Sequence, residues 1–248
     1  FPLGGILFEF FGWRGSMVVA AFLGVVTIVS ALFLLQETNN ARQTSLRLAS
    51  VAVDYLSLTK NKQFLLFAMN MGFHTSIFYA FLNFLPFVFK HLGYSASEFG
   101  YFIMLLPASF IVGSLISKKL TPILGITTMV RMGSLIIVAG IGVMAGLVFL
   151  GFESAWGLVL PGMVYSLAVG FSLPNATMGA INAVGRSVRG LGSGLAGSLQ
   201  MLLGSGIAAS TILLGAAEDT RIGLGILLLV AIASFVTTLF LVKDSEDT

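Results

Sequence analysis

The sequence predicts an all-α protein that is embedded in a membrane. Hydrophobic residues make up 57% of the 248 residues and charged residues only 9%, whereas soluble domains carry about 25% charged residues. The mean hydropathy is +1.00. Apolar runs of about 20 residues, the length that crosses a bilayer as a helix, recur along the chain between short polar turns. These three observations exclude an ordinary soluble domain and favour a bundle of spanning helices.

The chain opens with an apolar stub that ends at Gly12-Trp13-Arg14. Residues 16–35 then form an uninterrupted apolar run, which predicts a first complete span. The more polar residues 36–63 predict a linker to the rest of the chain. Apolar side chains recur at helical spacing within the linker and predict an amphipathic helix on the membrane surface; they are Leu48, Val51, Tyr55 and Leu58.

Six further apolar runs predict a second bundle over residues 64–242, and a polar tail follows at residues 243–248. The runs cover residues 64–89, 99–117, 126–150, 155–174, 191–217 and 222–242. Because the chain begins inside an apolar helix and without Met, we interpret residues 1–35 as the end of an amino-terminal bundle. On this interpretation the sequence is the carboxyl-terminal part of a longer protein.

Basic residues indicate which loops face the cytoplasm, because cytoplasmic loops of membrane proteins carry an excess of Lys and Arg. With the linker inside, alternation of the spans leaves only Arg14, Lys90 and Arg221 outside. The basic residues on the inner side are Arg42, Arg47, Lys60, Lys62, Lys118, Lys119, Arg131, Arg186, Arg189 and Lys243. This bias predicts a cytoplasmic linker and carboxyl terminus, and it supports the number of spans.

Several classes of function are excluded by what the sequence lacks. There is no cysteine, so disulfides, cysteine-ligated metals and thiol nucleophiles are excluded. The net charge of +3 is spread over short loops, which argues against nucleic acid as a partner. The sequence has no Walker motif, no paired carboxylates within the spans and no Asp-rich metal motif. We therefore expect no catalytic residues, no cofactor and no metal site.

The run at residues 64–89 carries more polar side chains than its neighbours and is the candidate wall of a cavity. It holds Asn70, His74 and Asn83, and Phe78 follows His74 by one helical turn. Polar side chains in a spanning helix face protein or water rather than lipid. Because an imidazole changes its charge near neutral pH, His74 has two interpretations. It lines a cavity, where it contacts a lipophilic or weakly cationic substrate or takes part in proton coupling, or it is a neutral histidine hydrogen-bonded to a neighbouring helix.

A motif at the start of the chain gives a family resemblance. Pro2-Leu3-Gly4-Gly5 is followed after a few residues by Gly12-Trp13-Arg14. This string resembles the fifth helix of drug:proton antiporters of the major facilitator superfamily, especially their bicyclomycin/chloramphenicol-resistance branch. The family motif has a Gly before the Pro, where this chain has Phe1.

Two later segments resemble the same family. Pro174-Asn175 precedes a glycine-rich helix with small residues at intervals of four, a spacing that lets helices approach closely; the segment includes Gly190, Gly194, Ser198 and Gln200. Antiporters of this branch have a similar Pro-Asn and glycine-rich pair in helices ten and eleven. Residues 113–119 resemble a degenerate copy of the superfamily's Gly-x-x-x-Asp-Arg loop signature, with Ser117 in the place of the Asp.

The resemblance implies a fold and a mechanism. It implies that the chain holds the end of helix five, helix six and the six-helix carboxyl-terminal half of a transporter in the bacterial cytoplasmic membrane. By alternating access, inward proton movement would drive the export of drugs or other small lipophilic molecules. It also implies a protein that works as a monomer in the lipid bilayer, with small-molecule substrate and protons as its partners. The principal proton-binding carboxylate of such proteins lies in the amino-terminal half.

The resemblance also assigns residues to roles. The expected substrate-cavity residues are Asn70, His74, Phe78, Asn83, Asn175 and Gln200. The expected conformational motif comprises Pro2, Gly4, Gly5, Gly190 and Gly194. Two other functions stay open from the sequence. An uptake symporter for a small metabolite has the same helix layout, and a non-transporting membrane scaffold or receptor would lack an accessible cavity.

Overall fold

The computed structural model describes residues 2–34 and 48–242, with side chains described from Phe11 and from Val53 onward except at Ala96 and Ser187. The chain divides into two compact units, Phe1–Val51 and Ala52–Thr248. The predicted tail and residues 36–47 of the predicted linker lie outside the described residues.

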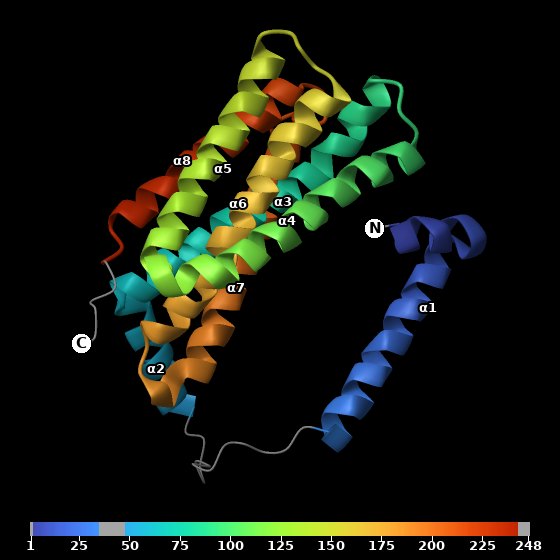
Figure 1. The fold of residues 1–248 in the computed structure, drawn as a ribbon. Coiled ribbons are helices and arrows are strands. Elements are labelled where there is room, and N and C mark those ends of the chain that lie inside the picture. Colours follow the sequence, from blue (N-terminus) through green and yellow to red (C-terminus); the bar gives the residue numbers. More distant parts are fainter. Residues whose placement is uncertain (1, 35–47, 243–248) are drawn as a thin grey trace. The chain divides into compact units, whose positions relative to one another are not determined.

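Helix α1 (Pro2–Leu34) forms the first unit and contains a sharp bend. Gly12 has φ 65° and ψ −174°, which is not a helical conformation. Glycine adopts such a positive φ without steric cost because it has no Cβ. The apolar stub was predicted to end at Gly12-Trp13-Arg14. In the structure a one-residue break at Gly12 divides it from the helical stretch that follows (Figure 1).

The helices that follow α1 are mostly long enough to cross a membrane. They are α2 (Leu48–Lys60), α3 (Lys62–His91), α4 (Ala96–Leu124), α5 (Ile126–Phe149), α6 (Ala155–Asn182), the short 3₁₀ turn η1 (Arg186–Val188), α7 (Arg189–Leu213) and α8 (Thr220–Leu239). Counting α1 from Phe11, seven helices of the described chain are long and apolar enough to span a bilayer. The predicted fold class, an all-α membrane bundle, is confirmed.

Local sequence signals explain where several of these helices begin. The side chain of Asn61 accepts a hydrogen bond from the backbone N–H of Phe64 at 3.1 Å and caps α3. Ser95 and Glu98 form a reciprocal capping box at the start of α4. The side chains of Ser154 and Asp219 cap α6 and α8 by accepting hydrogen bonds from the backbone N–H groups of Gly157 and Arg221. Each cap satisfies a backbone donor that has no partner in the first turn of a helix.

Two helices run further than their apolar runs predict. α4 continues past residue 117 to Leu124, and α6 continues through Pro174 to Asn182. Membrane helices tolerate proline because neighbouring groups satisfy the freed backbone carbonyl. Lys118 and Lys119 do not end α4, because long basic side chains near a helix end reach the water while the helix continues.

The packing of α3 to α8 repeats itself. α3 packs mainly against α6, α7 and α8, whereas α6 packs mainly against α3, α4 and α5; α5 and α8 also pack against each other. Exchanging the group α3–α5 with the group α6–α8 leaves these pairs unchanged. Because each group contains three helices, the two groups run in opposite directions. This is the pattern of an inverted repeat, which is common in transporter folds.

The α4–α6 pair crosses at two glycines. A Cβ atom at Gly170 would lie 2.5 Å from the carbonyl oxygen of Phe110 and 2.8 Å from the backbone nitrogen of Ser114. A Cβ atom at Gly113 would overlap the carbonyl group of Leu167. The backbones of the two helices therefore touch, as small residues allow in membrane bundles.

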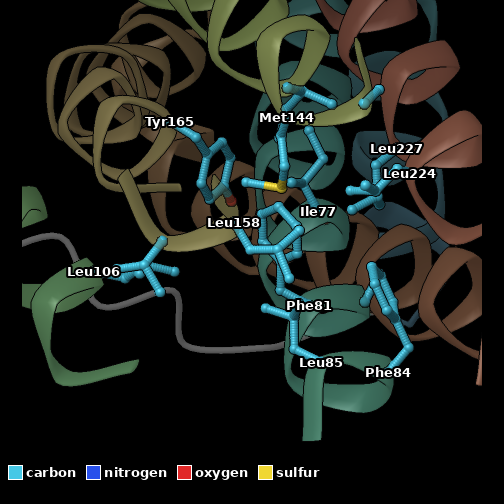
Figure 2. Close-up of a cluster of buried hydrophobic side chains, with 14 of the residues drawn as sticks. Ile77, Phe81, Phe84, Leu85, Leu106, Met144, Leu158, Tyr165, Leu224 and Leu227 are labelled. Carbon is cyan, nitrogen blue, oxygen red and sulfur yellow. The ribbon is translucent and has the colours of Figure 1, made fainter. Parts of the chain in front are cut away.

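The larger apolar core lies where α3, α5, α6 and α8 meet (Figure 2). Phe81 of α3 packs edge-on against Tyr165 of α6, with 5.4 Å between the ring centroids. Met144 of α5 lies beside this pair and Leu227 of α8 belongs to the same cluster (Figure 2). This core holds α3 and α6 together, and the polar site described next uses the same two helices.

Candidate functional site

A buried polar cluster lies within this otherwise apolar bundle. Asn70 and His74, on successive turns of α3, are 0% exposed. The side-chain nitrogen of Asn70 donates to the hydroxyls of Ser134 at 3.1 Å and Ser234 at 3.0 Å. Ser172 donates to the side-chain oxygen of Asn70 at 3.2 Å. Three serines from α5, α6 and α8 thus meet one amide of α3.

His74 shares two of these serines. Its Nε2 lies 3.3 Å from the hydroxyl of Ser134 and 3.0 Å from that of Ser234. Its Nδ1 is buried and has no hydrogen-bond partner among the described residues. Buried polar atoms are nearly always hydrogen-bonded, so an exception calls for an explanation. The cluster therefore fixes the imidazole through Nε2, whereas Nδ1 has no partner among the described residues.

A cavity of about 230 Å³ borders His74. Its walls come from α3, α4 and α6; they are formed by His74, Thr75, Phe78, Pro107, Phe110, Tyr165, Ser166, Val169 and Leu173. None of these lining residues carries a carboxylate, an ammonium or a guanidinium group. Such a mostly apolar cavity with a few polar groups is typical of small-molecule sites.

The lining hydroxyls are held by neighbouring helices. The Tyr165 hydroxyl donates to the backbone carbonyl of His74 at 2.9 Å. The Ser166 hydroxyl donates to the backbone carbonyl of Leu106. On α7, the side-chain nitrogen of Gln200 donates to the hydroxyl of Thr75 at 2.7 Å. These bonds orient the polar edge of the cavity.

Five of the six expected cavity residues, all but Asn175, fall into three groups. His74 and Phe78 line the cavity. Asn70 and Gln200 do not line it: Asn70 shares Ser134 and Ser234 with His74, and Gln200 donates to Thr75 on the wall. The structure does not bring Asn83 to the cavity, because nine residues after His74 a helical side chain points about 180° away. Asn83 is exposed.

Asn175 belongs to a second polar cluster, between α4 and α6. Its side-chain nitrogen donates to the hydroxyl of Ser117 at 2.8 Å and to the carbonyl of Phe171 at 2.6 Å. The Thr121 hydroxyl donates to the side-chain oxygen of Asn175 at 3.0 Å. Ser117, which occupies the place of an Asp in the loop signature, thus takes part in a neutral network among the described residues.

The expected conformational residues are placed as follows. Pro2, Gly4 and Gly5 lie in the first turns of α1, where side chains are outside the described part. Gly190 and Gly194 are exposed, and a Cβ atom on either would meet no atom within 4 Å. The face of α7 that packs against the bundle carries other small residues at intervals of four or eight: Gly192, Ala196, Gly204 and Ala208. Within this bundle, the close packing of α7 does not use Gly190 or Gly194.

The sequence interpretation missed the three serines and Tyr165. Ser134, Ser172 and Ser234 each stand within a spanning helix and are 0% exposed. A hydroxyl inside a spanning helix is a signal for contact with another helix. Serine also satisfies itself by bonding to the backbone of its own helix, so the sequence does not show which serines meet. Their meeting depends on how four helices pack.

The described fold defines a class, a multi-pass membrane protein whose helices α3 to α8 form a repeated bundle with a mostly apolar cavity beside His74. A family model described as Major Facilitator Superfamily matches residues 1–209. The chain therefore belongs to the major facilitator superfamily and is a membrane transporter. A comparison with curated proteins finds no significant match.

Proposed function

We propose that the protein is a proton-coupled transporter that exports small lipophilic molecules, drugs among them, by alternating access. The observation that carries the proposal is His74, a buried ring that borders an apolar cavity and whose Nδ1 has no hydrogen-bond partner among the described residues. The superfamily match supports transport, and the incomplete antiporter motifs of the sequence support export.

The lining of the cavity supports a lipophilic substrate. Phe78, Phe110 and Tyr165 contribute aromatic rings, and apolar contact with such rings is favourable for flat or bulky apolar groups. His74 and Thr75 supply the hydrogen-bonding groups. An unpaired charge is costly to bury in an apolar site, and the lining residues offer no carboxylate. The cavity beside His74 therefore holds the apolar part of the substrate in this proposal.

Other residues act indirectly in this proposal. Asn70 positions His74 through Ser134 and Ser234, and Gln200 positions Thr75. Asn175 ties α6 to α4 beyond the cavity. Pro2, Gly4 and Gly5 together with Gly190 and Gly194 form the conformational motif, the last two by contacts outside the bundle of α3 to α8.

The remaining parts of the proposal concern place and assembly. We place the protein in a bacterial cytoplasmic membrane, as a monomer, with the linker and carboxyl terminus in the cytoplasm. The excess of Lys and Arg on that side supports this orientation. The resemblance to the antiporter branch supports a principal proton-binding carboxylate in the amino-terminal half of the transporter, and the lining of the cavity beside His74 holds none.

The test is dye export from cells that express the full-length protein. We use N-phenyl-1-naphthylamine as a neutral lipophilic probe and tetraphenylphosphonium as a lipophilic cation. We expect faster export than in empty cells, abolished by a protonophore, and we expect His74→Ala to change the ratio of the two export rates more than it changes protonophore sensitivity. Unchanged retention of both probes, with membrane insertion confirmed, would contradict export. Accumulation of a probe would favour an uptake symporter instead.

A further inference from the structure

A second pocket, of about 320 Å³, lies near the end of α4. Its lining residues are Ser114, Ser117, Lys118, Thr121, Ile126, Pro174, Asn175 and Met178. Along α4, the crossing at Gly113 and Gly170 lies between this pocket and the cavity beside His74, which we call the central cavity. Pro107 and Phe110 line the central cavity and come before the crossing in α4. The two pockets are therefore distinct, and the proposed function uses only Asn175 of the second, as a tie between α6 and α4.

Most polar groups of the second pocket already have partners. Ser117, Thr121 and Asn175 are hydrogen-bonded to one another. The Oγ of Ser114 is buried and has no partner among the described residues. Lys118 likewise makes no ion pair or hydrogen bond with a described residue. The pocket thus offers two free donors, a hydroxyl and an ammonium group.

The charge of the pocket indicates the charge of its ligand. None of the lining residues is acidic, so Lys118 has no counter-charge within the lining. A lysine ammonium carries three donors and no acceptor. A group that satisfies both Lys118 and Ser114 must therefore be rich in acceptors, and a negative charge is favoured. Phosphate oxygens fulfil both conditions.

The place of the pocket indicates where such a group comes from. Ser117, Lys118 and Thr121 lie in the last two turns of α4, which ends at Leu124. This is the end of a predicted span, where lysine side chains reach toward the headgroup layer. Ile126, Pro174 and Met178 supply an apolar side to the same pocket. The pocket thus combines a polar, basic side with an apolar one near the end of a helix that is long and apolar enough to span a bilayer.

We propose that the pocket formed by Ser114 and Lys118 binds a phosphate group, carried by an anionic membrane lipid or by a water-soluble phosphate ester. Anionic lipids attract basic residues with about 1 kcal/mol per Lys near the surface, which corresponds to about a fivefold change in binding. The binding is selective because Ser114 adds a directed hydroxyl to the charge of Lys118.

The test measures lipid retained by the purified full-length protein in native mass spectrometry, after exposure to equal amounts of phosphatidylglycerol and phosphatidylcholine. We expect phosphatidylglycerol to be preferred. Lys118→Gln should lower its retention about fivefold, Lys118→Arg should preserve it, and Ser114→Ala should weaken it. The matched control is Lys119→Gln, because Lys119 is the adjacent lysine, is exposed like Lys118 and does not line the pocket. It should behave as the unmodified protein.

A further arm distinguishes the two sources of phosphate. Displacement of bound phosphatidylglycerol by millimolar glycerol 1-phosphate, or Lys118-dependent binding of that ester alone, assigns a water-soluble source. Retention of the lipid under the same conditions assigns the lipid. The proposal is overturned if Lys118→Gln and Lys119→Gln change retention equally, or if neither phosphate probe binds in a Lys118-dependent way. Because Lys118 makes no bond with a described residue, its replacement should leave the elution profile in size-exclusion chromatography unchanged.

Discussion

Two helix crossings hold equivalent places in the repeated bundle but are built differently. The α4–α6 crossing and the α3–α7 crossing exchange with each other when the group α3–α5 is exchanged with α6–α8. At the first, Gly170 faces backbone atoms of Phe110 and Ser114. At the second, Gly72 faces the side chain of Leu203, and Gly204 faces the side chains of Thr75 and Tyr79.

The difference teaches which crossing can adjust. A side chain can change its rotamer when a neighbour grows, whereas two touching backbones can separate only if the helices move. The α4–α6 crossing is therefore the fixed one, and it lies between the central cavity and the second pocket, which Ser114 and Lys118 line. The second crossing carries the Gln200–Thr75 hydrogen bond on the wall of the central cavity. If the bundle rearranges around a substrate, we expect the change at the second crossing.

The largest effect should follow Gly170→Ala. The new Cβ would lie 2.5 Å from the Phe110 carbonyl oxygen, so α4 and α6 must move apart. We expect the free energy of unfolding to fall by about 3 kcal/mol, at the upper end for overpacked sites. Reversible unfolding in detergent micelles measures it. The control is Gly162→Ala on the same helix, where the Cβ would lie 3.5 Å from the terminal carbon of Met144. Equal losses in both variants would contradict a fixed backbone crossing.

A smaller effect should follow Gly72→Ala, because the atoms in its way belong to a side chain. The new Cβ would lie 2.5 Å from Cδ1 and 2.9 Å from Cβ of Leu203. The end of the leucine can turn away, but its Cβ requires a slight shift of the helix, so we expect a loss of about 2 kcal/mol, smaller than that of Gly170→Ala. Combining Gly72→Ala with Leu203→Ala should cost less than the sum of the two single losses, since the truncated leucine makes room. Phe110→Ala should give no such relief to Gly170→Ala, because the obstacle there is the carbonyl group. Relief at both crossings, or at neither, would remove the distinction between them.

The smallest effect should follow Gly194→Ala. No atom lies within 4 Å of its would-be Cβ, so we expect the free energy of unfolding to change by no more than about 0.5 kcal/mol. The same micelle measurement tests this. A loss as large as that of Gly72→Ala would mean that this face of α7 packs inside the bundle. Slower dye export at unchanged stability would support the proposed conformational role of Gly194.

The helices were predictable from the sequence because the length of an apolar run is a local property. The ends of the helices were less predictable, since the predicted run stops at residue 174 and α6 continues through Pro174 to Asn182. The position of His74 beside Phe78 on a cavity wall follows from helical spacing. The sequence does not choose between two glycine faces of α7, because Gly190–Gly194 and Gly192–Ala196 have the same spacing and only packing distinguishes them.

The rest of the site depends on contacts between distant segments. Ser234 meets His74 across 160 positions of the chain, at 3.0 Å. No local pattern indicates this pairing, and the same holds for Ser134 and Ser172. Nδ1 of His74 and the hydroxyl of Ser114 have no partner among the described residues, and this becomes visible only when the packed helices are placed. These two free groups are the features on which both proposed sites rest.

The central claim is that the cavity beside His74 receives the substrate, and substrate protection of single cysteines tests it most directly. These 248 residues hold no cysteine, so Phe78→Cys introduces their single thiol, on the cavity wall, and any cysteine outside them is first replaced by serine. Asn83→Cys is the matched control, because it lies on the same helix and is exposed away from the cavity. The rate of labelling by a membrane-permeant maleimide is measured in both variants, with and without N-phenyl-1-naphthylamine. We predict that the probe slows labelling at position 78 and leaves position 83 unchanged; equal protection at both positions, or none at 78 in a variant that still exports the dye, would contradict the claim.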